Sequence, residues 1–249
     1  MLGELVYRKL THLNFRRWEE CVTLIDWLDA KPGELVLDVG CGDGWWDNRI
    51  SERGARVIGV DINERRLMIA NERNVANGNE YLYMDAEDLS FPDRHFDKAI
   101  SMCVIEHFHN EDAVLRSMAR VIKPGGLFVV SADSLSNPEI TEQEREDHRK
   151  RFAVNTFYTI DLLREKLDAA GFDLEHAEYI LTTPATLAIV RASWRIDDLY
   201  SDTSKLRDTL AEAGAFLIDT AGAAASRVAE KLGRRKDSGL TIVARARRR

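Results

Sequence analysis

The sequence predicts an α/β fold in which a doubly wound, mostly parallel sheet is covered by helices on both faces. Three observations support this prediction. Short β-rich runs alternate with helix-forming runs, two of the early strand runs are followed directly by an aspartate, and a glycine-rich turn follows the first strand run. The chain has 249 residues, of which 45% are apolar and 31% charged, so it has an ordinary globular composition and can bury a sizeable core.

The first expected element is an amphipathic helix over 15–28, where apolar residues recur at the three- and four-residue spacing of one helix face. A strand at 35–39 then leads into the glycine-rich turn at 40–44 and a helical stretch that runs to residue 53. The elements expected after it are a strand at 56–60, a helix at 64–75, strands at 81–84 and 96–102, a helix at 112–122, a turn at 124–126, a strand at 127–131, a helix at 159–170, and strands at 173–181 and 239–245.

Charge and cysteine content narrow the function classes. With 35 basic and 42 acidic side chains the net charge is −7, so no nucleic-acid partner is expected from the chain as a whole. Residues 204–249 are an exception, since their Lys and Arg outnumber their Asp and Glu. No apolar run reaches membrane-spanning length and no secretory leader is evident, and three cysteines suggest neither a disulfide framework nor a zinc site. A cytoplasmic location is therefore expected.

A ligand site is expected at the carboxyl ends of the first strands. In parallel sheets of this kind, ligands bind beyond those ends, near the point where the strand order reverses. The glycines of the turn at 40–44 let a ligand approach backbone amides that a Cβ would block. Asp38 lies in the first strand run, Asp61 follows the second and Asp85 follows the third, so three carboxylates are expected around one crevice.

The residues after the glycine turn exclude two common cofactor classes. A dinucleotide fingerprint would need glycine where Trp45 stands, and no Gly-Lys-Ser or Gly-Lys-Thr follows to make a phosphate loop. Carboxylates suit a cation and a ribose diol and would repel phosphates. The pattern therefore indicates a nucleoside-like ligand that has a positive group and no phosphate.

Five motifs, in this order and at this spacing, resemble the class I S-adenosylmethionine-dependent methyltransferases. They are Leu37 to Gly44, Val60-Asp61, Asp85 to Leu89 with Phe91-Pro92, Phe96-Asp97 through Glu106-His107, and Lys123 to Gly126. Within this class the sequence is similar to the type 11 small-molecule group, which includes quinone-biosynthesis enzymes, over about residues 30–135. The resemblance implies a Rossmann-like, seven-stranded, mostly parallel sheet whose last strand is antiparallel. It also implies S-adenosyl-L-methionine as cofactor, S-adenosyl-L-homocysteine as product, and no metal.

The resemblance also implies roles for individual residues. Asp38 would hold the glycine loop near the methionine amino group, Asp61 would bind both ribose hydroxyls, and Asp85 would accept from the adenine amino group. The implied cofactor-binding residues are Asp38, Gly40, Cys41, Gly42, Gly44, Asp61, Ile62, Asp85, Ala86 and Met102. For Met102, ordinary core packing is an equally good interpretation.

Methyl transfer from a sulfonium is an in-line displacement, so the protein mainly orients the reactants and excludes water. An oxygen acceptor must lose a proton, and His107, just after the fourth strand, is the candidate base. Its alternative role is structural, as a cap or bridge of the next helix. The function expected is methyl transfer to a small-molecule or lipid- or glycan-linked acceptor, at oxygen. N-methylation of a small molecule or protein, and cofactor binding without catalysis, are the alternatives.

Two less patterned segments are expected to shape the acceptor side. Residues 133–156 are densely charged and are interpreted as a lid or a solvated helix. Residues 184–237 are interpreted as a helical cap inserted into a core of 1–183 and 238–249, between strands six and seven. An apolar stripe with basic flanks over 204–236 suits a peripheral membrane contact, or packing on its own domain or on a second subunit, so a monomer and a homodimer are both open.

Overall fold

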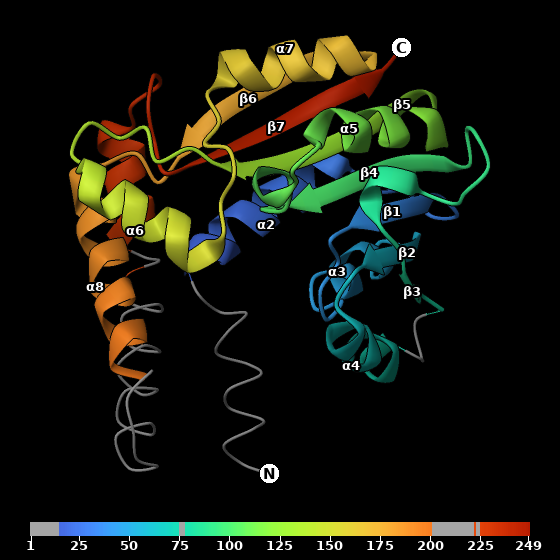
Figure 1. Cartoon of the computed structure of the whole chain (residues 1–249), viewed down its shortest axis with the longest axis horizontal. Helices are drawn as coiled ribbons and strands as arrows, with labels where there is room; N and C mark the ends of the chain where they lie inside the picture. Colours follow the sequence, from blue (N-terminus) through green and yellow to red (C-terminus); the bar gives the residue numbers. More distant parts are fainter. Residues whose placement is uncertain (1–14, 75–77, 201–221, 223–224) are drawn as a thin grey trace.

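A computed structural model describes residues 15–74, 78–200, 222 and 225–249. They form a seven-stranded sheet in the order β3-β2-β1-β4-β5-β7-β6 (Figure 1). The strands are β1 Leu35–Val39, β2 Arg56–Asp61, β3 Glu80–Tyr83, β4 Phe96–Met102, β5 Ile122–Asp133, β6 Phe172–Ile180 and β7 Thr241–Arg248. β1 to β5 pair in parallel, and β7 is antiparallel to both β5 and β6. The predicted fold class, including the antiparallel last strand, is confirmed.

One predicted turn lies inside a strand. Phe96 pairs with Ile122 while Lys98 pairs with Leu127, so residues 123–126 bulge from the ladder between β4 and β5. A Cβ at Gly126 would lie 2.5 Å from the carbonyl oxygen of Asp97, and this close approach explains the glycine. The Pro-Gly-Gly sequence predicted a break between elements, but the strand continues past it because β4 pairs with β5 on both sides of the bulge.

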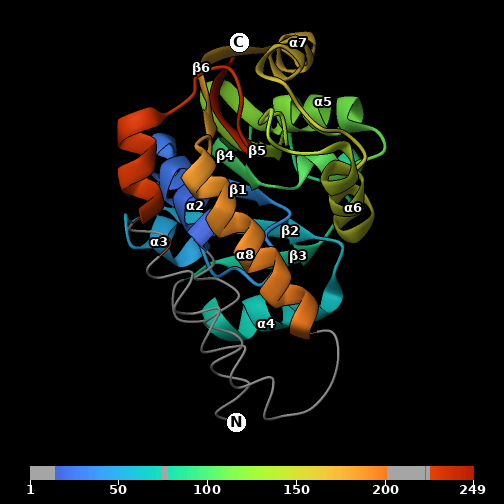
Figure 2. The ribbon, with the colours of Figure 1, turned by 90° about the vertical axis from the view of Figure 1, so that its left-hand side faces the viewer.

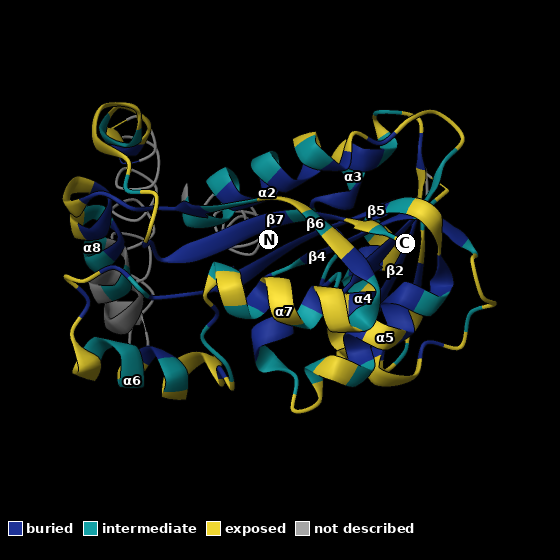
Figure 3. Ribbon diagram, turned by 90° about the horizontal axis from the view of Figure 1, so that it is seen from above, coloured by how far each residue is buried: buried dark blue, intermediate teal, exposed yellow. Residues whose placement is uncertain are grey.

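Helices cover both faces of the sheet (Figure 3). Their bounds are α2 Phe15–Leu28, α3 Asp47–Ser51, α4 Glu64–Asn74, α5 Glu111–Val121, α6 Glu142–Phe152, α7 Ile160–Ala170 and α8 Pro184–Tyr200, with 3₁₀ turns η2 Ala86–Asp88 and η3 Ile105–His107. α5 and α7 lie on one face and α2 and α3 on the other. This two-sided covering accounts for the near-continuous burial of β1, β4 and β5.

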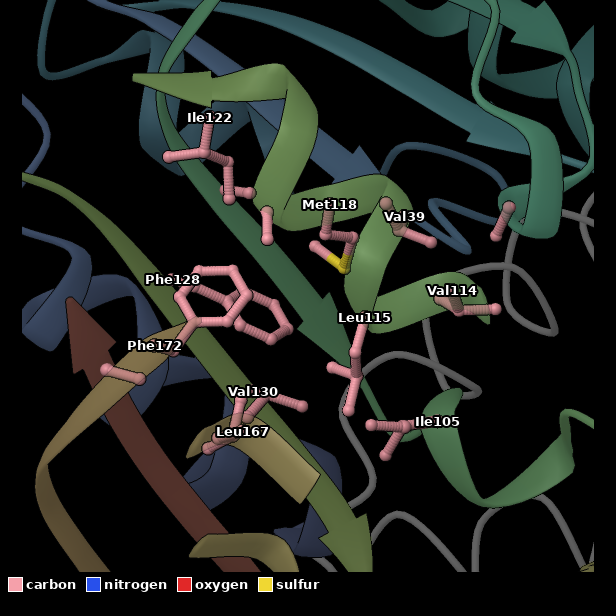
Figure 4. Close-up of a cluster of buried hydrophobic side chains, with 14 of the residues drawn as sticks. Val39, Ile105, Val114, Leu115, Met118, Ile122, Phe128, Val130, Leu167 and Phe172 are labelled. Atoms are coloured by element: carbon pink, nitrogen blue, oxygen red, sulfur yellow. The ribbon is translucent and has the colours of Figure 1, made fainter. Parts of the chain in front are cut away.

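Each face has its own core. On the α5 and α7 side, Leu115, Met118 and Leu167 pack against the aromatic pair of Phe128 and Phe172, whose ring centroids are 5.5 Å apart (Figure 4). On the other side, α2 buries Cys21, Ile25 and Leu28 of the stripe that its sequence predicted, together with Leu24, in one cluster. Packing on both faces holds the sheet in place. The loops of the candidate site follow the carboxyl ends of its strands.

α6 and α8 lie beyond the end of the sheet toward which β4 and β6 point (Figure 1). Viewed from that side, α8 crosses in front of the strands and α6 lies at one flank (Figure 2). Arg191 of α8 forms an ion pair with Glu144 of α6, with 2.6 Å between Nε and Oε1. These two helices therefore stand over the edge where the ligand site was expected.

The predicted insertion, 184–237, is helical at both described ends, over 184–200 and 225–233, while residues 201–221, 223 and 224 lie outside the described residues. Its described ends contact the core, and the division into core and cap stays a prediction. Leu187 and Val190 belong to the same buried cluster as α2 and β7, and Glu230 accepts hydrogen bonds from the backbone of Thr182 and Thr183. Among the helices that the structure describes, none has the length and apolar character needed to cross a bilayer.

Candidate active site

The glycine loop between β1 and α3 is anchored on the neighbouring strand and turn. The amides of Gly40 and Cys41 both donate to the carbonyl of Val60, at 2.8 and 3.1 Å. A Cβ at Gly40 would lie 2.4 Å from Cγ2 of Val104, in the segment after β4. Gly40 is thus required by packing as well as by its positive φ of 75°.

Gly42 and Gly44 differ in what surrounds them, although both have positive φ. A Cβ at Gly44 would lie 2.6 Å from the hydroxyl of Tyr81, whereas a Cβ at Gly42 would come no closer than 3.6 Å to Nη1 of Arg66. Gly44 therefore makes room for the protein's own tyrosine. Gly42 leaves space beside the loop, and the expectation that it faces a ligand stays a prediction.

Asp61 lies at the end of β2 and is held in place by a hydrogen bond from the glycine loop. Its Oδ2 accepts from the amide of Gly42 at 2.9 Å, and its Oδ1 accepts from the amide of Asn63 at 2.8 Å. Each carboxylate oxygen keeps a second lone pair for another donor. The carboxylate is therefore oriented in advance for a ligand that carries hydroxyl groups.

A buried acid pair lies behind the loop. Asp38 and Asp47 are 1% and 0% exposed and interact with each other, and Asp47 also interacts with the Tyr81 hydroxyl. Oδ1 of Asp38 has no other hydrogen-bond partner among the described residues. Burial and the charge of Asp47 raise the pKa of Asp38, and burial raises the pKa of Asp47 to about 6. Asp47 was missed by the sequence analysis, because an acid in the first turn of a helix is usually a dipole partner.

The other predicted cofactor residues lie along the same edge. Ile62 is 66% exposed beside Asp61, and Asp85, also exposed, follows β3 and accepts from the amide of Glu87 at 2.9 Å. Ala86 is buried. Met102, at the end of β4, is half-buried and packs against the core on the α2 side. The ends of four adjacent strands thus carry the whole predicted set.

His107 lies in η3 and is half-buried. Its Nδ1 is 3.3 Å from the carbonyl oxygen of Ala153, and its own carbonyl accepts from Nδ2 of Asn155 at 2.6 Å. The residues that follow α6 therefore fold back on the turn that carries His107. This structural contact is made with the end of α6 and not with the next helix, α5, which the sequence analysis had considered. It lies at the rim of the same strand edge.

A second group of buried polar residues gathers at the ends of β4 and β5. Ligand-type atoms of Cys103, Glu106 and Asp133 all lie within 4.8 Å of one another, and all three residues are buried. Nε2 of His148, on α6, is 2.6 Å from Oδ2 of Asp133. The sequence analysis missed Asp133 and His148 as site residues because the segment 133–156 looked like a solvated, charged helix.

A surface hollow of about 500 Å³ lies at the opposite end of β1 and β2 and is lined by residues that include Gly33, Leu35, Gly54 and Arg56. None of the predicted site residues lines it. The strand edge that carries the glycine loop is therefore the better candidate. The backbone at Gly42 is open there, the Asp61 carboxylate is held in one orientation, and Oδ1 of Asp38 is buried.

Comparison with known proteins gives the same assignment for the central part of the chain. Residues 37–130 match the type 11 family described as "Methyltransferase domain". The chain is 30% identical over 166 residues to malonyl-[acyl-carrier protein] O-methyltransferase of Serratia marcescens, which covers 66% of this chain and 63% of that protein. It is 35% identical over 114 residues to the ubiquinone biosynthesis O-methyltransferase of Dechloromonas aromatica, over 43% and 49% of the two chains. It thus spans less than two thirds of either relative.

Among solved structures, the fold is similar to phosphoethanolamine N-methyltransferase 2 of Haemonchus contortus in complex with S-adenosyl-L-methionine. The TM-score is 0.67 at 21% identity, over 93% of this chain and 52% of that one. This similarity concerns the fold alone.

Proposed function

We propose, because residues 37–130 match the type 11 methyltransferase family, that this chain is a class I methyltransferase that transfers a methyl group from S-adenosyl-L-methionine to a small-molecule or lipid- or glycan-linked acceptor. The observation that carries this proposal is the Asp61 carboxylate, bound to the Gly42 amide beside the open side of the glycine loop. This hydrogen bond places Asp61, an acid suited to bind a diol, next to the glycine loop, whose backbone a ligand can approach at Gly42.

The residues present suit this cofactor. The unpartnered, buried oxygen of Asp38 is suited to a positive group, and the two amide-bound oxygens of Asp61 are suited to a ribose diol. The exposed Ile62 supplies an apolar surface for a purine, with Asp85 and Ala86 at its edge. The proposed cofactor residues are therefore those of the sequence analysis, with Gly44 acting through packing.

The bound cofactor would supply a methyl group on a sulfonium, which is a good leaving group. The protein's part in such a displacement is to align donor and acceptor and to keep water out. α6 and α8, which stand over the strand edge and are joined by the Arg191–Glu144 ion pair, are placed to cover the acceptor.

We propose oxygen as the atom that is methylated, with His107 as the base. Both relatives named above are O-methyltransferases, which supports this choice. Transfer to nitrogen is the alternative, because the chain is also 30% identical over 157 residues to phosphoethanolamine N-methyltransferase 1 of Zea mays. The position of the label in the methylated product distinguishes the two.

The predicted membrane contact through 204–236 stays a proposal, since most of that segment lies outside the described residues. In the part that is described, Arg234 forms an ion pair with Glu178 and Arg235 lies 3.5 Å from Glu139. These pairs reduce the positive charge available to a lipid surface. Whether the protein is a monomer or a homodimer also stays open, and its molar mass in solution would decide it.

The proposed function is tested in two steps. Titration calorimetry with S-adenosyl-L-methionine and S-adenosyl-L-homocysteine measures cofactor binding. Mass spectrometry of metabolite extracts incubated with the protein and methyl-labelled cofactor then detects the product. Binding followed by label transfer supports the proposal. Binding without transfer to any acceptor would favour a non-catalytic module, and no binding would refute the cofactor assignment.

A further inference from the structure

We propose, on the basis of the function above, that the buried cluster of Cys103, Glu106 and Asp133 binds the polar head of the methyl acceptor, and that this head is a hydrogen-bond donor without negative charge, a hydroxyl or an ammonium group. The cluster lies outside the predicted cofactor set. His148 is its positioning residue, because it contacts Asp133 from the helix that stands over the strand edge.

The cluster lies next to the glycine loop. Cys103 and Glu106 follow β4, Asp133 ends β5, and these two strands are neighbours in the sheet. Between Cys103 and Glu106 stands Val104, the residue that Gly40 packs against. A group bound by the cluster would therefore be one residue away from the loop proposed to hold the methyl donor.

One oxygen of each acid lacks a hydrogen bond, although Oδ1 of Asp133 forms a longer ion pair with Arg16. Glu106 and Asp133 are 1% and 5% exposed, yet Oε2 of Glu106 and Oδ1 of Asp133 have no hydrogen-bond partner among the described residues. Their other oxygens are engaged, by the amide of Asp133 and by His148. Buried polar atoms in folded proteins are nearly always paired, so these two indicate a missing donor.

The environment pushes the two acids toward different protonation states. Burial and the charge of Asp133 raise the pKa of Glu106. Burial acts to raise the pKa of Asp133 as well, but its hydrogen bond with His148 and the charge of Arg16 outweigh that effect and lower the pKa. The cluster thus combines one carboxylate with one neutral acid, an arrangement that can both accept from and donate to a single hydroxyl group.

The charges around the cluster disfavour an anionic acceptor. Two arginines of α2 approach it, and both face acids. Nη2 of Arg16 is 3.7 Å from Oδ1 of Asp133, and Nη1 of Arg17 is 3.3 Å from Oε1 of Glu20. Because Asp133 and Glu20 balance these two cations, no positive charge is left over to attract a carboxylate or phosphate. A hydroxyl or ammonium group would bring no further negative charge into this buried site.

His148 contacts the oxygen of Asp133 that does not face Arg16, and so holds the Asp133 carboxylate in position. The histidine is 4% exposed, and its ring lies 4.6 Å from that of Phe152, 6.1 Å from Phe157 and 5.6 Å from Trp194, measured between centroids. These rings hold the imidazole so that Nε2 faces Asp133. They also place aromatic surface near the cluster, which guides the choice of probes.

The test uses three probes that share a phenyl group and differ in the head: 2-phenylethanol, 2-phenylethylammonium and phenylacetate. Each is titrated into the full chain saturated with S-adenosyl-L-homocysteine, and binding is followed in ¹H–¹⁵N spectra. We expect the alcohol and the ammonium to bind at least tenfold more tightly than phenylacetate. Equal or tighter binding of phenylacetate, or no binding of any probe, would overturn the inference.

Proton release on binding distinguishes an ammonium head group from a hydroxyl head group. Calorimetry in two buffers of different ionisation enthalpy should show a proton released when 2-phenylethylammonium binds, because the new cation lets Glu106 ionise. The alcohol should bind without proton release. Selective binding of either probe supports the inference, and the comparison shows which head group the cluster prefers.

Asp133→Asn is the informative variant, and Glu142→Gln, an exposed acid of α6, is its matched control. Asp133→Asn removes the charge opposite Arg16, so the preference over phenylacetate should fall below threefold while the affinity for S-adenosyl-L-homocysteine stays within twofold. An unchanged preference would count against the inference. If the variant does not fold, the wild-type probe series still decides. Failure of the wild-type protein to bind S-adenosyl-L-homocysteine would instead refute the proposed function.

Discussion

The amide of Gly42 donates a hydrogen bond of 2.9 Å to Oδ2 of Asp61, a residue that lies 19 positions further along the chain. The bond ties the open glycine of the loop to the acid at the end of β2. The shape of the loop and the orientation of the acid are therefore coupled, and a change at either residue should affect ligand binding through the other.

Replacing Asp61 tests the proposed ribose contact. Asp61→Ala should weaken binding of S-adenosyl-L-methionine by about 2–4 kcal/mol, because two charge-assisted hydrogen bonds to the ligand are lost. Titration calorimetry measures the change, with Asp173→Ala, an exposed acid on β6, as the control. If Asp61→Ala binds S-adenosyl-L-methionine with unchanged affinity, the proposed ribose contact is wrong.

Gly42→Val should abolish cofactor binding, since the side chain would fill the open space beside the loop and the backbone has a φ of 56°. Gly33→Val is the matched control, because Gly33 also has a positive φ and nothing lies within 4 Å of its Cβ position. Both variants carry similar backbone strain. If the two lose cofactor affinity equally, strain and not the filled space is responsible.

His107→Ala tests the proposed base. If the histidine takes a proton from an oxygen acceptor, turnover should fall by about 100-fold or more while cofactor affinity is unchanged. The measurement is single-turnover methyl transfer with the acceptor found by mass spectrometry. A loss below about threefold would leave His107 with the structural contact to Ala153 alone.

Asp47 should make stability depend on pH. Because its pKa is raised to about 6 in the fold, the native state holds an extra proton between about pH 4 and pH 6, and the free energy of unfolding should fall as the pH rises through this range. Asp47→Asn should flatten that dependence and stabilise the protein near pH 7 by on the order of 1–3 kcal/mol. Urea unfolding at several pH values measures it, and an identical pH profile for the variant would contradict the assignment.

Cosedimentation with anionic vesicles tests the membrane contact predicted for 204–236. If the basic segment binds lipid, the protein should pellet at low salt, and should stay in the supernatant at high salt or when Arg234, Arg235 and Lys236 are neutralised. Neutral vesicles are the control. Absence from the pellet at low salt would leave the segment as a lid or a subunit interface.

The sequence by itself determined the sheet and the residues that we propose for cofactor binding. Each strand, the glycine turn and the acids Asp38, Asp61 and Asp85 are encoded by patterns within about twenty residues, and parallel pairing then brings their ends to one edge. The structure placed these residues where the sequence analysis expected them. Only the bulge at 123–126 and the extent of some elements differ.

The tertiary structure alone decided the remaining contacts. The approach of Tyr81 to Gly44, the burial of Asp47 and the contact of His148 with Asp133 depend on how helices cross the sheet, and this depends on packing between residues far apart in the sequence. His148 stands in a helix with so many charges that its pattern predicted exposure. The helix nevertheless buries this one ring, because α6 packs over the end of β5 and against Trp194 of α8.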